Sequence, residues 1–173
     1  MNSNGTEEMF KLGQVVFLEG ITKLKECKEQ NANFIFKRSN LIIKKRLAVV
    51  EFTHGFELIL KAVLIRMGYS INRIKNGIFR DDQKVRDIVN PEKTIELEDV
   101  IRFFGKEYPE CPFDSVDKLR QLRNQIIHRG TRIDEKKKEY FTGAIDCLIA
   151  VYRKEAINHR KFLREIEQAK NEI

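Results

Sequence analysis

The segment LRQLRNQIIHRG, residues 119–130, contains the side chains of this chain that are best suited to chemistry. Arg123 and Asn124 are adjacent, and His128 follows four residues after the asparagine. An imidazole titrates near neutral pH and can take or give a proton, while a guanidinium stays charged and can bind two phosphate oxygens. With Asn124 orienting a water, a hydroxyl or the histidine, this set suits attack of a ribose 2′-OH on the adjacent phosphate without a metal ion.

The apolar residues of this segment recur at helical spacing, so the set is expected near the end of a helix. Asn124 and His128 then share a face, and Arg123 lies about 100° further round and must reach across with its long side chain. The helix end leaves carbonyl groups free, and its dipole favours a protonated imidazole. An alternative interpretation is that His128 merely caps those carbonyls.

A second pair, Arg153 and His159, also has an arginine four to six residues before a histidine. The spacing alone is therefore not specific. Arg153 is followed by Lys154 rather than by an asparagine, and this pair is expected inside a helix rather than at a helix end. Both differences favour Arg123 and His128 as the chemical pair.

The sequence lacks other catalytic motifs. It has no GxxxxGK[ST] or GxGxxG phosphate loop, no HExxH zinc motif and no GxSxG elbow. The three histidines have no metal-ligand spacing, and the three cysteines are far apart with no CxxC pair. We therefore expect neither a metal site nor a cofactor, and we expect free thiols in a reducing compartment.

The elements that must position the 119–130 segment are predicted to be helices. The 173 residues include only nine glycines and three prolines, and no stretch alternates at period two for more than a few residues. Helices are expected over about 6–29, 33–67, 94–105, 114–129 and 134–169, with Asp114 as an N-cap and with glycines 68, 105 and 130 as stops. We expect one all-α domain over 1–173, a bundle of four to five helices, two of them long.

Apolar faces support three of these helices. The first helix has a loose face, and the end of the second has the cleanest periodicity in the chain. The residues of these faces are Phe10, Val15, Leu18, Ile21 and Leu24; Phe56, Ile59, Leu60, Val63, Leu64 and Met67; and, in the 94–105 helix, Leu97, Val100, Ile101 and Phe104. The pattern weakens over 69–91, where Asn76-Gly77 predicts a turn and a short helix is an option.

The charge balance favours a polyanionic partner. The formal net charge is +7 and the pI is about 9.3. The basic stretch FKRSNLIIKKR, residues 36–46, is most simply a solvated face. We see no signal peptide and no apolar run long enough to span a bilayer, so we expect a cytoplasmic protein without a membrane partner.

The 119–130 segment resembles the signature of HEPN domains, helical nucleotide-binding bundles in which an arginine, a polar residue and a histidine end a late helix. FELILKAVLIRMG, residues 56–68, resembles the upstream Glu-Leu-x-x-Lys helix of many such domains. The resemblance implies a HEPN-like bundle and a metal-independent endoribonuclease that leaves a 2′,3′-cyclic phosphate. It also implies a homodimer with the active site at its interface.

Carried over by position, the resemblance gives each matching residue a role. Arg123 would stabilise charge on the phosphate, Asn124 would orient groups, and His128 would be the acid–base residue. Glu57 and Lys61 match the upstream helix and would line the cleft; as an alternative they form a simple i, i+4 ion pair. We add the arginines of the same segment, Arg120 and Arg129, as candidate RNA-binding residues.

Two further hypotheses compete with a free-standing ribonuclease. One is a catalytically inactive HEPN-like module that binds RNA or dimerises. The other is a toxin, in a toxin–antitoxin pair or in anti-phage defence, whose nuclease is held silent by an antitoxin or regulatory protein docked on residues 72–87.

Overall fold

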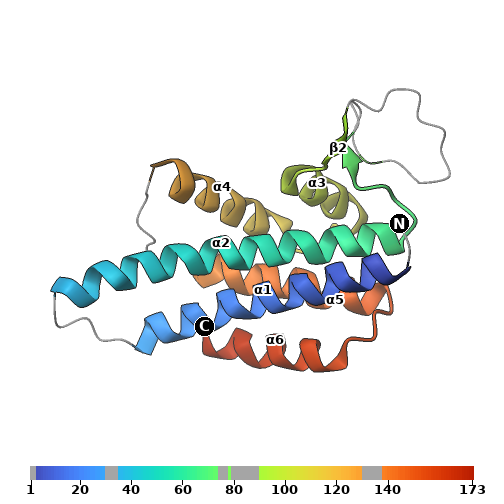
Figure 1. Ribbon diagram of the computed structural model, residues 1–173. Helices are drawn as coiled ribbons and strands as arrows, with labels where there is room; N and C mark the ends of the chain where they lie inside the picture. The colour runs from blue at the N-terminus through green and yellow to red at the C-terminus, as the bar shows by residue number, and fades with distance from the viewer. Residues whose placement is uncertain (1–2, 30–34, 74–77, 79–89, 130–137) are drawn as a thin grey trace.

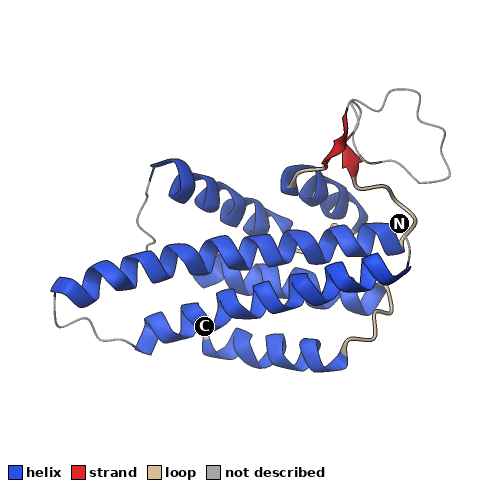
Figure 2. Ribbon diagram, viewed as in Figure 1, coloured by secondary structure: helices blue, strands red, loops and turns tan. Residues whose placement is uncertain are grey.

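The computed structural model describes residues 3–29, 35–73, 78, 90–129 and 138–173, which form six helices and a short two-stranded ribbon (Figures 1 and 2). The all-α class is confirmed. The expected count of four to five helices is wrong, because the described residues already contain six. In chain order the elements are α1 Ser3–Glu29, α2 Ile35–Arg66, β1 Asn72–Arg73, β2 Asn90–Thr94, α3 Leu97–Glu107, α4 Phe113–Arg129, α5 Lys138–Lys154 and α6 Arg160–Glu172.

The two longest helices, α1 and α2, lie side by side along most of their length (Figure 1). Glycines allow this close approach. A Cβ on Gly55 would lie 2.4 Å from the backbone nitrogen of Phe17, and a Cβ on Gly20 would lie 2.5 Å from that of Phe52. The two backbones therefore touch directly, and α4 and α3 pack on other parts of α2.

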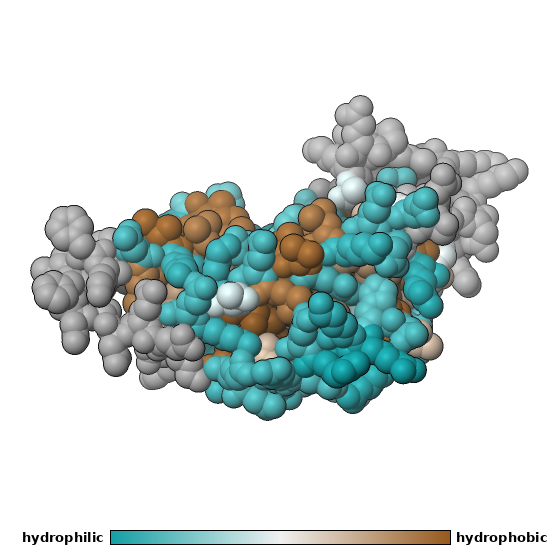
Figure 3. All heavy atoms as spheres, turned by 60° about the horizontal axis from the view of Figure 1, so that its bottom comes forward, coloured by the Kyte–Doolittle hydropathy of each residue, from teal (hydrophilic) through white to brown (hydrophobic). Residues whose placement is uncertain are grey.

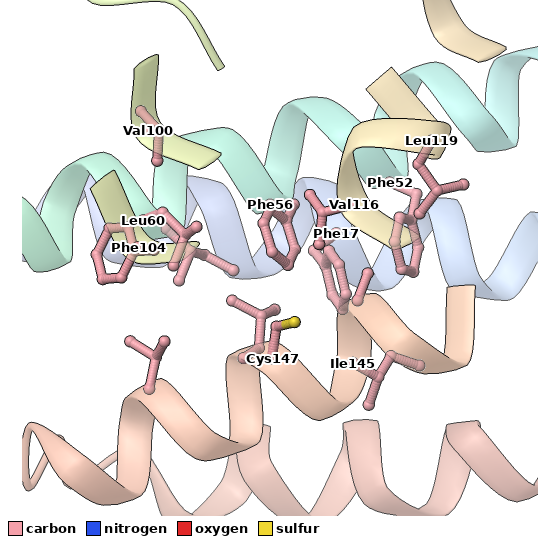
Figure 4. Close-up of a cluster of buried hydrophobic side chains, with 14 of the residues drawn as sticks. Phe17, Phe52, Phe56, Leu60, Val100, Phe104, Val116, Leu119, Ile145 and Cys147 are labelled. Atoms are coloured by element: carbon pink, nitrogen blue, oxygen red, sulfur yellow. The ribbon is translucent and has the colours of Figure 1, made fainter. Parts of the chain in front are cut away.

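One continuous apolar core joins all six helices. Figure 4 shows Phe17, Phe52 and Phe56 pointing towards α5, which supplies Ile145 and Cys147. Burial raises the pKa of the Cys147 thiol, as expected for a thiol inside an apolar core. The predicted apolar faces of the 94–105 helix and of the end of α2 are confirmed, with Met67 partly buried, although Thr94 belongs to β2 and the helix starts at Leu97.

On α1 the predicted face is partly wrong. Val15 is 55% exposed, and the buried stripe includes Phe10, Phe17 and Ile21. Other large apolar side chains are exposed as well, and Figure 3 shows brown hydrophobic patches among teal hydrophilic residues on one face. Among the side chains that the structure describes, the exposed large apolar residues are Leu12, Val15, Ile43, Leu47 and Ile127.

The end of α2 leads directly into the ribbon. Gly68 has a φ of +82°, the Gly68 amide donates to the Ile65 carbonyl, and the Tyr69 amide donates to the Leu64 carbonyl. This is a Schellman motif with glycine at C′, so the predicted stop is confirmed. β1 then pairs antiparallel with β2, with Asn72 opposite Thr94 and an irregularity after that pair.

Helix α3 begins with a capping box. The Glu96 side chain accepts from the backbone at Asp99, and the Asp99 side chain accepts from the Glu96 amide. The predicted stop at Gly105 is wrong, because α3 continues to Glu107. Helix α4 starts at Phe113 rather than after an Asp114 cap.

The long last helix that we expected is divided into α5 and α6. Ala156 takes a left-handed conformation, with a φ of 49°, and the Ile157 amide donates to the Tyr152 carbonyl. The Ala156 amide donates to the Arg153 carbonyl, which completes a second Schellman motif. Because this break contains neither glycine nor proline, the sequence carried no signal for it.

Several predictions fall outside the described residues: the Asn76-Gly77 turn, most of the 72–87 segment, the Gly130 stop and the start of the last helix near Asp134. None of the described helices is both long and apolar enough to cross a membrane.

Candidate active site

Helices α2 and α4 together hold the most buried polar cluster that involves the predicted site residues. Arg123 Nη1 on α4 donates to Glu57 Oε2 on α2 at 3.2 Å, and Lys61 Nζ donates to Glu57 Oε1 at 2.7 Å. One carboxylate thus bridges two cations, one through each of its oxygens. The structure therefore brings together the two segments that the sequence singled out separately.

The three side chains of this cluster are well shielded from solvent. Their exposed fractions are 9% for Lys61, 14% for Glu57 and 21% for Arg123. With two cations and one carboxylate, the formal charge of the cluster is +1. Because partial burial weakens solvent screening, that charge attracts an anion more strongly than a surface lysine would.

Two more polar groups complete the cluster. Arg123 Nε donates to Asn124 Oδ1 at 3.4 Å, a long hydrogen bond between neighbouring residues. Lys61 Nζ also donates to Thr94 Oγ1 on β2 at 3.2 Å. Glu57 and Lys61 therefore form the i, i+4 ion pair that was one of the two alternatives. Glu57 also contacts the candidate catalytic residue Arg123.

His128 stands apart from this cluster. It lies in the last turn of α4 and is exposed, and no hydrogen bond or ion pair joins its ring to any residue that the structure describes. A capping role thus has no support within those residues. His128 is five residues beyond Arg123, about 7.5 Å along the helix axis.

The two additional arginines differ from one another. Arg120 is engaged within the chain, through Asp117 at 2.7 Å and Glu98 of α3 at 3.2 Å, and its side chain is 19% exposed. The Asp117 carboxylate also accepts from Gln121 Nε2 at 2.7 Å. Arg129 is exposed at the end of α4, on the same turn as His128.

The competing pair is separated by the break between α5 and α6. Arg153 lies in the last turn of α5, is 69% exposed and pairs with Glu167 at 2.7 Å. His159 occupies the N-cap position of α6 without a capping hydrogen bond from its side chain, and its Nδ1 contacts Gln14 Nε2 of α1. Our expectation that both lie inside one helix is wrong.

Sequence reasoning did not identify Thr94 or Glu98 as neighbours of these arginines and lysines. No local signal marks either residue, because each contact joins elements far apart in the chain. Among the described residues, no group of three or more His, Cys, Asp and Glu side chains is arranged to hold a metal ion.

Comparison with known proteins identifies a family. No curated protein and no solved structure matches the chain. Residues 32–169 match DUF3644, a domain of unknown function, and this match spans α2 to most of α6. The match includes every residue of the Glu57–Arg123 cluster and His128. Because it covers most of the 173 residues, the chain belongs to the DUF3644 family.

Proposed function

We propose that this DUF3644 protein is a HEPN-type, metal-independent endoribonuclease that acts as a homodimer, in toxin–antitoxin or anti-phage defence. The observation that carries the proposal is the ion pair of Arg123 with Glu57. The Arg123 guanidinium is 21% exposed and is held by a carboxylate of another helix that is 14% exposed, whereas the ion pairs of Arg102 and Arg153 are largely open to solvent and worth little.

The chemistry follows from the side chains. The ribose 2′-oxygen attacks the adjacent phosphorus, the bond from phosphorus to the 5′-oxygen breaks, and the products are a 2′,3′-cyclic phosphate and a 5′-hydroxyl. His128, as the acid–base residue, takes the proton of the 2′-hydroxyl and gives a proton to the departing 5′-oxygen. Arg123 stabilises the charge on the phosphate, and Asn124 orients the reacting groups. The exposed imidazole of His128 is accessible to a substrate.

Cleavage of RNA by the purified protein in EDTA tests this proposal. His128→Ala should lower the cleavage rate about 10²–10⁴-fold, the usual contribution of one acid–base side chain. His54→Ala is the matched control, because His54 is an exposed histidine on α2. Circular dichroism should show that both variants fold. Equal cleavage by wild type and His128→Ala would reject the assignment.

The dimer needs a separate test. Ile127 is 57% exposed and directly precedes His128, so an apolar contact between copies there would bring two motifs together. Ile127→Lys should convert a dimer into a monomer in light scattering. Val15→Lys is the control, because Val15 is an equally bare apolar residue on α1. A dimer that survives Ile127→Lys would contradict this interface.

A second candidate function is an inactive RNA-binding module. The separation of His128 from the Arg123 cluster within one chain favours it, because the +1 cluster binds phosphate without needing the histidine. That module would bind RNA with Arg123-dependent affinity and leave the RNA intact in EDTA.

A further inference from the structure

We propose that Thr94, on the ribbon strand β2, is a positioning residue that orients Arg123 through Lys61 and Glu57. This inference rests on the proposed function, since Arg123 is the phosphate-binding group there. It adds to that function a residue outside the helical motif, reached through two intervening side chains.

The contacts form an unbroken series. Thr94 Oγ1 accepts from Lys61 Nζ at 3.2 Å, and the same ammonium donates to Glu57 Oε1 at 2.7 Å. The other oxygen of Glu57 accepts from Arg123 at 3.2 Å. Because each oxygen of one carboxylate binds a different cation, the position of the ammonium sets the rotation of the carboxylate. That rotation in turn sets where the guanidinium is held.

Losing either hydrogen-bond acceptor is unfavourable for the Lys61 ammonium. Lys61 as a whole is 7% exposed, so water reaches little of it, and its charge needs hydrogen-bond acceptors from the protein. Within the described part of the chain, those acceptors are Glu57 and Thr94. Loss of the Thr94 hydroxyl leaves the ammonium to move towards water or further onto Glu57.

The backbone that carries the Thr94 hydroxyl is held in place on both sides. The next residue, Ile95, is 1% exposed, and the Ile95 amide donates to the Ile71 carbonyl at 2.8 Å. Thr94 is itself paired with Asn72 across the ribbon. The strand end is thus anchored in the core on one side and by β1 on the other, so it is a firm support for Lys61.

The first test compares three variants for RNA cleavage in EDTA. Thr94→Val keeps the shape and removes the acceptor. Because Thr94 is exposed, its hydrogen bond should contribute no more than an ordinary one, so kcat should fall about three- to tenfold. KM should change less than about twofold, because other phosphate contacts remain. Thr94→Ser should restore kcat. Thr22→Val is the control, since Thr22 is an exposed threonine on α1 that donates to the Leu18 carbonyl of its own helix.

The second test needs no activity. In ¹⁵N NMR of the RNA-free protein, the Nε–H signal of Arg123, assigned by its loss in Arg123→Lys, should shift or broaden in Thr94→Val and return in Thr94→Ser. Absence of wild-type cleavage would defeat the proposed function. The NMR result alone would then decide whether Thr94 orients Arg123 through Lys61 and Glu57. An Arg123 signal unchanged by Thr94→Val, or a loss of kcat that Thr94→Ser does not restore, would overturn the proposal.

Discussion

Arg123 on α4 donates to Glu57 on α2 across a sequence separation of 66 residues, at 3.2 Å between Nη1 and Oε2. Neither residue is marked as a partner of the other by local sequence. The contact exists because the buried faces of α2 and α4 pack together and leave these polar side chains at the edge of the packed region.

Glu57→Gln tests the value of this carboxylate. The change removes the charge between Lys61 and Arg123, so the two cations repel one another and the cluster charge rises from +1 to +2. We expect a loss of about 1–2 kcal/mol in the free energy of unfolding. We also expect tighter RNA binding with slower cleavage, because the guanidinium is no longer held.

Urea denaturation and RNA fluorescence anisotropy measure these effects. Glu167→Gln is the control, since Glu167 is 43% exposed in its pair with the 69% exposed Arg153, and the change should cost less than about 0.5 kcal/mol. If Glu57→Gln were as stable as wild type and bound RNA no more tightly, the cluster would have no energetic role.

The two Schellman motifs predict opposite effects of opposite substitutions. Ala156 has a φ of 49°, which costs a residue with a Cβ about 1 kcal/mol, so Ala156→Gly should raise the melting temperature. Gly68 has a φ of +82°, so Gly68→Ala should lower the melting temperature, at a free-energy cost of similar size, although no atom crowds the added methyl group. Calorimetry measures both, and a change of the same sign in the two variants would refute this account.

The contact of α1 with α2 depends on missing side chains. In Gly55→Ala the new methyl carbon would lie 2.4 Å from the Phe17 nitrogen, so the helices must separate, at a cost of about 1–3 kcal/mol. Gly105→Ala is the control, because its nearest neighbour outside the helix backbone, Phe113 Cβ, is 3.8 Å away. That variant should be neutral or stabilised, since alanine favours helix. Urea midpoints that fall equally in both would argue against the close contact.

His159 predicts a dependence of stability on pH. Burial lowers the pKa of His159, although nearby Glu7 opposes the shift. The unfolded chain therefore takes up the proton first, near pH 6.5, and stability falls from about that pH down to the folded pKa, with little change above it. His159→Gln should flatten the plot of melting temperature against pH in this range. His54→Gln, at an exposed histidine, should keep the wild-type slope. Parallel slopes in wild type and His159→Gln would exclude His159 as the cause.

Local patterns predicted much of the helical structure. The face of α2 from Phe56 to Leu64 is buried as its spacing indicated, and Gly68 ends that helix by a known motif. Gly105 was misleading, because a glycine stops a helix when it takes a positive φ, and α3 runs on to Glu107. The break at Ala156 was invisible, because alanine is the best helix former.

The candidate site divides in the same way. The residue types and their order along α4 were readable, and so was the i, i+4 spacing of Glu57 and Lys61. Which of these side chains meet could not be read, because contacts between helices depend on how two surfaces pack. Thr94 enters from a strand whose pairing partner lies 22 positions earlier, at Asn72.

The glycine-mediated seam of α1 and α2 has a practical consequence for anyone who isolates the family segment. The match begins at residue 32, and α1 ends at Glu29. A fragment cut to the matched region would lose the helix that lies against Gly55 and Phe52, and would bare that apolar stripe to water. Helix α1 lies outside the matched residues yet supplies Phe10, Phe17 and Ile21 to the core, so the packed unit of this chain is larger than the matched segment.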